Sequence, residues 1–351
     1  MSGPPDDSGP VGAKSSQEII DELNATLDAA LSNHGRINYE IALSEAEEKF
    51  VREFEADTCH EAVLSDFEFG GILGQGSFGA VYLSRFKDGT IFALKQQGFT
   101  ENAVSERKFS FALNSPFIVK ALYAFQHENL YYIAFECAMW SSLYKQCEVI
   151  RASRSEELLK LIAAQIVLAL EYLHHCRVVH SDLKRSNVVI FEDGYIKLCD
   201  FGLARRQEVG EVAFRLMGKR GMLAPEIKKA LLTSALSKDW WDLGTMIKDL
   251  LPRDDSGVRQ DSTAASSQEQ RPRVASESLS DLLKGLHNLN TIGRLGALKG
   301  GAKDVKDHAW FSDVDFIKLY YKKIPMLEKL PPDLHRIEWA PPAAQAQNVR
   351  W

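Results

Sequence analysis

His180-Ser-Asp-Leu-Lys-Arg-Ser-Asn187, followed after a short gap by Asp200-Phe-Gly202, is the stretch around which the rest of this sequence is organised. The residues between the two motifs form two short apolar runs on either side of Glu192-Asp-Gly194, a pattern that predicts a β-hairpin. Such a hairpin carries Asn187 at its start and Asp200 at its end, so that an amide and a carboxylate face the same side. Oxygen ligands of this kind suit a hard cation such as Mg2+, with phosphate oxygens completing its shell.

The two motifs together resemble the catalytic and metal-binding loops of protein kinases, His-x-Asp-Leu-Lys-x-x-Asn and Asp-Phe-Gly. Either motif alone is a weak signal, but their order and spacing are specific. The resemblance implies that Asp182 accepts or orients the proton of the substrate hydroxyl and that Lys184 neutralises the γ-phosphate. It also implies that Asn187 and Asp200 hold Mg2+ and that ATP is the phosphate donor.

A glycine-rich stretch, Gly74-Gln-Gly-Ser-Phe-Gly79, lies between two apolar runs that predict strands. A strand after the GxGxxG pattern, where a Rossmann unit has a helix, excludes a dinucleotide-binding fold. A glycine-rich hairpin instead lets backbone N–H groups close over triphosphate oxygens. The nucleotide-binding residues that the resemblance implies are Leu73, Gly74, Gly76, Ser77, Phe78, Gly79, Val81, Ala93, Lys95, Glu136, Ala138 and Val189.

Two residues further along complete the implied catalytic set. Ile91-Phe-Ala-Leu-Lys95 resembles the strand that carries the kinase lysine, and Glu106 lies in the predicted helix 103–113, where kinases place the glutamate that pairs with it. Ser110 and Ala121 are smaller than the residues that usually pack this helix onto the core. We therefore expect this helix to pack weakly on the core unless its phenylalanines, Phe109 and Phe111, compensate.

The resemblance narrows to the AGC group, particularly cyclic-nucleotide-dependent kinases, which favours Ser and Thr hydroxyls as acceptors. In the C-terminal half it implies that Asp239 ties the catalytic-loop backbone to a large helix and that Glu226 pairs with Arg294. A long apolar pattern at 156–176 predicts the central helix of this half. The segments that carry the narrower resemblance are 114–120, 123–126, 238–244, 293–296 and 304–311.

These features predict an α+β, two-lobed protein kinase fold with a small β-rich lobe and a large, mainly helical lobe. The expected segments are a disordered N-terminus, a helical extension, the kinase domain and a C-terminal tail. Apolar periodicity predicts one helix from Gln17 to Gly35 and a second over 44–63. These helices either pack on the kinase domain or dock a regulatory subunit or anchor. The boundaries are 1–16, 17–66, 67–311 (N-lobe 67–135, hinge 136–140, C-lobe 141–311) and 312–351.

Composition limits the alternatives. The chain has 351 residues and a net charge of -6. It therefore lacks the excess of basic residues that is typical of a nucleic-acid-binding protein. Its five cysteines show no CxxC spacing, as expected of reduced thiols in a cytoplasmic protein. No apolar run approaches the ~20 residues that are needed to cross a bilayer, so we expect no membrane insertion.

Several positions depart from the kinase pattern. Ser181 replaces the arginine that grips an activation-loop phosphate, and residues 203–224 contain no Ser, Thr or Tyr. Activity is therefore predicted to be independent of phosphorylation in this loop. Lys219 stands where a threonine contacts the catalytic residues, and residues 252–280 are either a disordered loop or a phosphorylated insert. Of three positions that are acidic in arginine-directed relatives, Ser142, Ser186 and Asp249, only the last keeps its charge.

Two functional hypotheses follow from the sequence. The first is an ATP- and Mg2+-dependent protein Ser/Thr kinase that acts on protein substrates. The second is a nucleotide-binding scaffold with little or no phosphotransfer, which Lys219 and the altered docking surface favour. The full set of Lys95, Glu106, Asp182, Lys184, Asn187 and Asp200 favours the enzyme.

Overall fold

The computed structural model describes residues 30, 33–76, 79–207, 225–252, 275–291, 293–297 and 299–340, with the backbone alone for 225–235. The chain divides into two units, residues 1–42 and 43–351. In the first unit, residues 33–42 are helical, so the predicted helix end at Gly35 is wrong. One glycine inside a helix costs only about 1 kcal/mol, which favourable neighbours can offset.

The second unit begins with α2 (Ala46–Ala56), which is shorter than the predicted helix over 44–63. The helix ends because Asp57 adopts a left-handed conformation with φ 49°, and its backbone N–H donates to the Glu53 carbonyl. An irregular segment and the short 3-10 turn η1 (Leu64–Asp66) lead from there into the first strand. The helical extension expected over 17–66 is therefore interrupted after Ala56.

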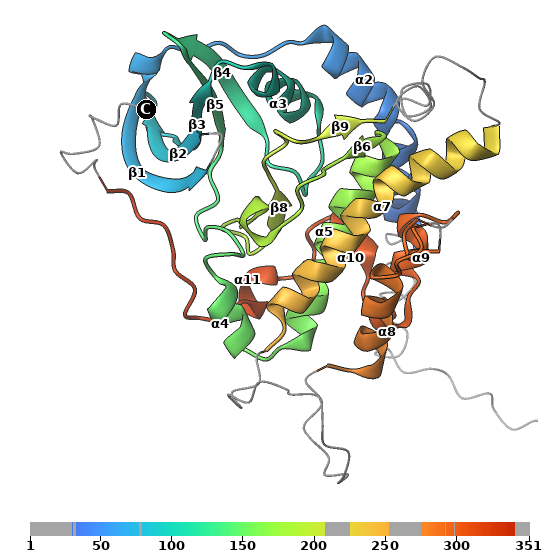
Figure 1. Ribbon diagram of the computed structural model, residues 1–351. Helices are drawn as coiled ribbons and strands as arrows, with labels where there is room; N and C mark the ends of the chain where they lie inside the picture. Colours follow the sequence, from blue (N-terminus) through green and yellow to red (C-terminus); the bar gives the residue numbers. More distant parts are fainter. Residues whose placement is uncertain are drawn as a thin grey trace, which may run out of the picture. The chain divides into compact units, whose positions relative to one another are not determined.

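A 5-stranded antiparallel sheet in the order β1-β2-β3-β5-β4 forms the first layer of this unit (Figure 1). The helix α3 (Glu101–Ala112) connects β3 to β4, and its N-cap Thr100 accepts a bond from the Ala103 N–H. Alternating burial along β2 and β3 places one face of the sheet against an aromatic core. The strands are β1 (Phe67–Gly76), β2 (Gly79–Phe86), β3 (Ile91–Gly98), β4 (Ala121–His127) and β5 (Leu130–Glu136).

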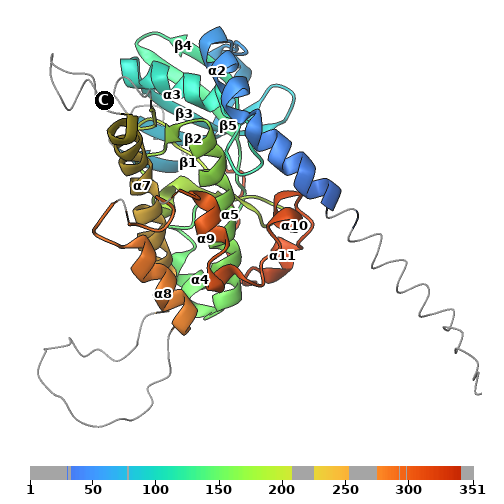
Figure 2. The same cartoon turned by 90° about the vertical axis from the view of Figure 1, so that its right-hand side faces the viewer.

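The remainder of the unit is mainly helical and is organised around α5 (Glu156–His175). Fourteen of its residues are buried, and Figure 2 shows other helices on several sides of it. In length and composition α5 could cross a membrane, contrary to our expectation from the sequence, but 78% of its apolar window is buried inside the protein. The other helices are α4 (Cys147–Ala152), α7 (Pro225–Leu250), α8 (Glu277–Leu286), α9 (Ala302–Lys306), η3 (Ala309–Phe311), α10 (Phe316–Tyr320) and α11 (Met326–Lys329).

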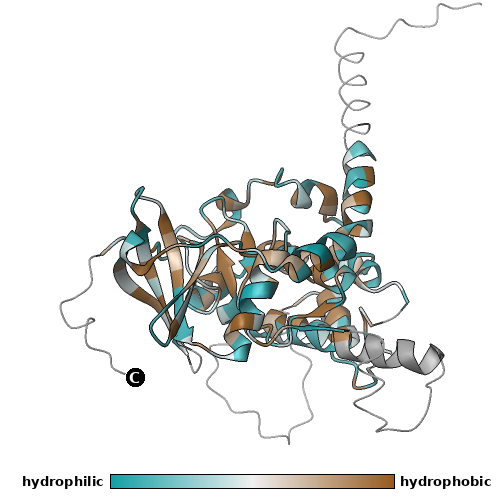
Figure 3. Cartoon of the chain, turned by 90° about the horizontal axis from the view of Figure 1, so that it is seen from above, coloured by the Kyte–Doolittle hydropathy of each residue, from teal (hydrophilic) through white to brown (hydrophobic). Residues whose placement is uncertain are grey.

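Two small sheets hold the loops that carry the sequence motifs. The predicted hairpin is present as β7 (Val188–Ile190) and β8 (Ile196–Leu198), with Gly194 at φ 79° in its turn. A second pair, β6 (Val178–Val179) and β9 (Arg205–Arg206), brackets the catalytic loop, which contains the turn η2 (Arg185–Asn187). The expected α+β fold, with a β-rich lobe and a helical lobe, is confirmed. Figure 3 shows hydrophobic residues, coloured brown, on both the strands and the helices.

Candidate active site

A buried ion pair joins the sheet to α3. The Lys95 Nζ on β3 lies 2.5 Å from Glu106 Oε1 on α3 and 2.9 Å from Asp200 Oδ1 after β8. Burial acts to lower the pKa of Lys95, but the two carboxylates outweigh it, so this pKa is raised and the lysine stays charged. The sequence-predicted lysine, glutamate and aspartate therefore meet, although they come from three separate elements.

The carboxylates of this cluster respond to burial in different ways. For Asp200, burial acts to raise the pKa, but the Lys95 ammonium reverses the shift and the pKa is lowered. For Glu106, burial acts to raise the pKa, whereas the Lys95 ammonium and the hydrogen bonds from Lys95 and Gln97 act to lower it. Two donors contact Glu106, Lys95 at 2.5 Å and Gln97 at 3.0 Å, and we therefore take its carboxylate as ionised at neutral pH.

The helix α3 is held from outside by α2. The ring of Phe109 lies 5.0 Å from that of Phe54 and 6.0 Å from that of Phe50. Asp57, just after α2, accepts a bond of 2.6 Å from Arg107 and lies 3.2 Å from Lys108. Figure 2 shows the two helices side by side. Phe109 thus compensates for the small neighbouring residues through α2.

On its inner side α3 contacts the sheet through Phe111. This ring packs on a cluster of buried residues that includes Val119, Ala121 and Ile133. Ser110 is buried, and its hydroxyl has no hydrogen-bond partner among the described residues. The small residues at 110 and 121 therefore do not leave the helix loose, because a phenylalanine on either side of Ser110 packs against a different element.

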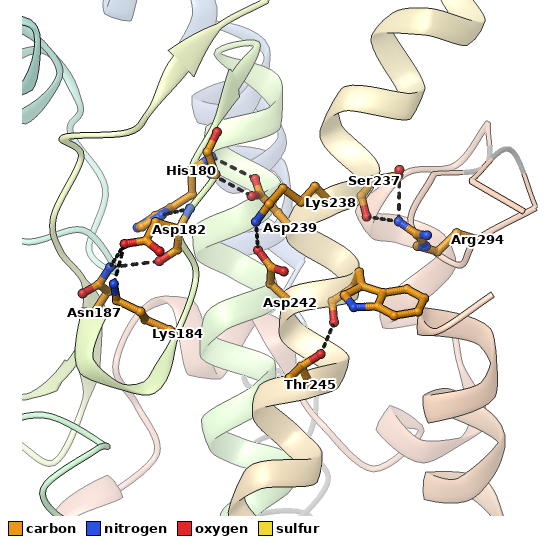
Figure 4. A network of polar contacts seen from close by, with 12 residues as sticks. His180, Asp182, Lys184, Asn187, Ser237, Lys238, Asp239, Asp242, Thr245 and Arg294 are labelled. Carbon is orange, nitrogen blue, oxygen red and sulfur yellow. Dashed lines mark hydrogen bonds and ion pairs between the residues drawn. The ribbon is translucent and has the colours of Figure 1, made fainter. Parts of the chain in front are cut away.

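The catalytic loop is fixed by Asp239, a buried residue of α7 (Figure 4). Its carboxylate accepts the backbone N–H groups of His180 at 3.0 Å and Ser181 at 3.1 Å, and it lies 3.0 Å from His174 Nε2. Burial acts to raise the pKa of Asp239, but these bonds outweigh it and the pKa is lowered. Ser181 has φ 69°, a strained value for a residue other than glycine, which these bonds maintain.

The polar side chains of the loop point toward one another. Lys184 Nζ lies 2.7 Å from Asp182 Oδ2, and Asn187 Nδ2 donates to the same oxygen at 3.1 Å and to the Asp182 carbonyl at 2.9 Å. Figure 4 shows the three side chains gathered on one side of the loop. This arrangement places one carboxylate beside one ammonium, which suits the acceptance of a proton next to a phosphate.

The metal ligands predicted from the sequence lie at the two ends of the β7–β8 hairpin. The backbone N–H of Cys199 donates to the Asn187 carbonyl at 3.0 Å and thereby holds the ends together. Both Asn187 and Asp200 line the same cavity, and a Cβ at Gly202 would lie 3.4 Å from Asp200 Oδ1. Amide and carboxylate oxygens fit Mg2+. No group of three or more His, Cys, Asp or Glu that could hold a metal ion is found in the described part of the chain.

A cavity of about 470 Å3 separates the sheet from the catalytic loop. Its size suits a nucleotide. Gly76 and Gly79 lie at the ends of β1 and β2, away from this lining, and Ser77 and Phe78 lie outside the described residues. The predicted nucleotide-binding residues that line the cavity are Leu73, Gly74, Val81, Ala93, Lys95, Glu136, Ala138 and Val189.

Sequence reasoning missed a wall of the cavity that comes from the C-terminal tail. Ile337 lines the cavity, and its backbone N–H donates to the Met139 carbonyl at 2.7 Å. Lys145 also lines it and donates to the Leu73 carbonyl at 2.8 Å, across the opening. No local pattern marks Ile337, because its position depends on how the tail returns to the sheet.

Other predictions fall outside the described residues. Lys219 and the rest of 208–224 are among these, as are the side chain of Glu226 and residues 253–274. The predicted partner of Glu226, Arg294, donates to the Ser237 carbonyl at 2.9 Å (Figure 4), and its pairing with Glu226 stays a prediction. The predicted loop over 252–280 is not irregular throughout, because α8 begins at Glu277 with Ser276 as its N-cap.

Comparison with known proteins finds a family match and several related chains. The protein kinase domain family matches residues 67–311. The chain is 36% identical over 276 residues to the cAMP-dependent protein kinase catalytic subunit of Dictyostelium discoideum, which covers 74% of this chain and 42% of that protein. Identity to cAMP-dependent protein kinase type 3 of Saccharomyces cerevisiae is 31% over 289 residues, 76% of this chain and 70% of that protein. Ribosomal protein S6 kinase alpha-6 of Danio rerio is 31% identical over 283 residues, 76% of this chain and 38% of that protein. The chain therefore spans less than half the length of two of these three relatives.

Proposed function

Because this chain belongs to the protein kinase family and its relatives lie in the AGC group, we propose that it transfers the γ-phosphoryl group of ATP to Ser or Thr hydroxyls of proteins. The observation that carries the proposal is the ion pair between Lys95 and Glu106 at 2.5 Å, with Asp200 at 2.9 Å from the same lysine. In kinases this pair and the metal-binding aspartate must both be in place before transfer.

The role of each residue in the site follows from its position. Lys95 and the cavity lining hold the nucleotide, and Asn187 and Asp200 would hold Mg2+, which neutralises phosphate charge when bound. Asp182 accepts or orients the hydroxyl proton of the substrate. Lys184, whose Nζ lies 2.7 Å from Asp182 Oδ2, offers its ammonium to the transferring phosphoryl group. Phosphoryl transfer requires mainly positioning and charge stabilisation, and these residues supply both.

The binding-module alternative receives no support from the described residues. A scaffold that only holds nucleotide has no need of Asp182 or Lys184, neither of which lines the nucleotide cavity as described. Both are nevertheless held in a loop whose backbone is fixed by the buried Asp239. Because these two side chains are held in place although they lie outside the lining of the nucleotide cavity, the arrangement supports the enzyme hypothesis.

We propose further that activity does not require a phosphate in the activation segment. Residues 203–224 carry no hydroxyl side chain, and Ser181 stands where an arginine would grip such a phosphate. The expected result is that protein expressed in bacteria, with a mass that shows no phosphate, is active. Activity that appears only after treatment with an upstream kinase would contradict this proposal.

The decisive experiment is a phosphotransfer assay with ATP, Mg2+ and a peptide library, run on the wild type and Asp182→Asn. We expect turnover to fall by about 10²-fold or more in the variant, because the base is lost. ATP should still raise the melting temperature of both proteins. Asp313→Asn is the matched control, because Asp313 is 66% exposed and pairs only with Lys160 among the described contacts. Wild-type protein that binds ATP without any turnover would contradict the proposed function.

A further inference from the structure

A second cavity of about 340 Å3 adjoins the catalytic loop and shares Tyr144 and Ser186 with the lining of the nucleotide cavity. Lys184 and Ser186 of the loop lie in its wall, and Lys184 is 2.7 Å from Asp182. An acceptor chain whose hydroxyl reaches Asp182 must therefore place a neighbouring side chain in or beside this cavity. The residues that line it are Tyr144, Leu183, Lys184, Arg185, Ser186, Asp242, Thr245, Met246 and Asp249.

One carboxylate of this cavity is already paired. Asp249, near the end of α7, has its Oδ2 3.1 Å from Arg185 Nε of the catalytic loop. The Arg185 side chain is 20% exposed and that of Asp249 is 46% exposed, so the pair is partly shielded from water. Arg185 Nη1 also lies 2.8 Å from the Cys147 Sγ, and its guanidinium is 5.5 Å from the ring of Tyr144. Contacts with three different residues therefore fix this arginine.

The position of Asp249 is fixed as well. Arg151 of α4 is buried, and its Nε donates to the Asp249 carbonyl oxygen at 2.7 Å. The Cys147 thiol donates to the same oxygen at 3.6 Å. Because α4 holds both the backbone of Asp249 and, through Cys147, the guanidinium of Arg185, the pair is preorganised and loses little side-chain entropy when it forms.

The second carboxylate of the cavity also has a cation of its own. Asp242 forms an ion pair with Lys238, one turn earlier on α7 (Figure 4). Burial raises the pKa of Asp242, and Lys238 only partly opposes this shift. The cavity wall thus holds two carboxylates, each opposed by an intramolecular cation, together with hydroxyl and apolar side chains. Among the described residues that line the cavity, both carboxylates are paired, so neither is free for a substrate.

We propose that Arg185 is a specificity-determining residue. Its guanidinium pairs with the carboxylate of Asp249, which would otherwise be free to bind a basic side chain of the substrate. The proposal rests on the proposed kinase function and adds the class of substrate. A substrate arginine would have to displace a guanidinium that is tethered in place, whose effective concentration is in the mM range or above. The preferred substrates therefore carry an uncharged side chain where they meet this cavity.

The test is a set of serine peptides that differ at a single position, scanned along the peptide, with Arg, Gln or Glu. For the wild type we expect kcat/KM for the best Arg peptide to be within about 2-fold of the Gln peptide, because no carboxylate is free to discriminate. For Arg185→Gln we expect one position at which Arg is favoured by about 10-fold, since Asp249 is then uncovered. In Asp249→Asn, the freed Arg185 should favour Glu at that position. The double variant should favour neither.

Binding of the same peptides, labelled and measured by fluorescence anisotropy with Mg2+ and a non-hydrolysable ATP analogue, separates this proposal from the proposed function. The expected order of affinities is the same as for kcat/KM, and it does not depend on turnover. Loss of turnover with this order intact would overturn only the kinase assignment. A wild type that favours Arg by 10-fold, or an Arg185→Gln variant with unchanged preference, would overturn the role of Arg185. Melting temperatures confirm that each variant is folded, and Arg185→Lys, which keeps a cation, should retain the wild-type preference.

Discussion

Lys95 shows how a single residue can hold three elements together. Its ammonium joins β3 to α3 through Glu106 and to the segment after β8 through Asp200, and its side chain is 11% exposed. Removing one partner of a buried ion pair leaves an uncompensated charge. The free-energy cost of that charge is larger than the stabilisation that the intact pair provides. The cluster is therefore expected to respond strongly to a change of one charge.

The first prediction concerns Glu106→Gln, which keeps the size of the side chain and removes its charge. We expect kcat/KM for ATP to fall by about 10–100-fold, because Lys95 then turns toward Asp200, its remaining carboxylate. Steady-state kinetics with ATP as the varied substrate would check this. Glu148→Gln is a control on an exposed glutamate of α4. An unchanged kcat/KM in Glu106→Gln would show that the ion pair has no part in nucleotide positioning.

A second prediction uses the cysteine that precedes Asp200. Burial raises the pKa of the Cys199 thiol to about 12. The raised value favours the neutral thiol, so at pH 8 the thiolate fraction is about 1 in 10⁴. We expect Cys199 to resist iodoacetamide at pH 8 in the folded protein and to react once the protein is unfolded in guanidinium chloride. Peptide mapping would show this difference, and rapid modification of Cys199 in the folded state would contradict it.

At this scale the sequence predicted which residues come together in the candidate site, and it missed residues whose contacts depend on tertiary structure. Fixed motif spacing made Asp182, Asn187 and Asp200 recognisable, because the loop that carries them is local. Nothing local indicated that Arg185 would reach Asp249, which lies on another element. The sequence showed the charge at 249, but not that a neighbour already neutralises it.

At the scale of elements, α2 and α3 form a pair that the sequence suggested only in part. The prediction that α3 packs weakly on the core was based on the small residues at 110 and 121. In the structure α3 packs against α2 instead, with 5.0 Å between the rings of Phe109 and Phe54. Helix ends were predicted less well than helix centres. The positions of Gly35 and Asp57 show why, since one glycine did not end a helix and one left-handed aspartate did.

The third prediction is that α2 keeps α3 in the position where Glu106 meets Lys95. Phe54→Ala removes a half-buried ring and should lower the free energy of unfolding by about 1–3 kcal/mol. It should also raise KM for ATP by a few-fold, because α3 then samples positions without the ion pair. Leu327→Ala, in α11, removes an apolar side chain that is 49% exposed and serves as the control. A loss of stability without any change in KM would limit α2 to a structural role.

At the scale of the whole second unit, the tail links the helical lobe back to the sheet. From α11 the chain runs past α4 toward β1, as the red segment in Figure 1 shows. Gln146 holds it by donating to the His335 carbonyl at 2.7 Å and accepting the His335 N–H at 3.2 Å. Arg85 of β2 stacks on Trp339, with 4.1 Å between the guanidinium carbon and the ring centroid. The tail therefore connects both lobes and borders the nucleotide cavity between them.

The last prediction tests whether this connection serves nucleotide binding. Ile337→Ala should raise KM for ATP by about 3–10-fold with kcat nearly unchanged, because the apolar side chain lines the cavity and lies away from Asp182 and Lys184. Removing residues 335–351 should raise KM further, since the anchors at Gln146 and Arg85 are lost as well. Ile317→Ala provides the control for an apolar truncation in the same tail, outside the cavity lining. Equal KM values in the wild type and the truncated protein would mean that the tail borders the cavity without contributing to binding, whereas a fall in kcat alone would place its effect on the motion of the two lobes.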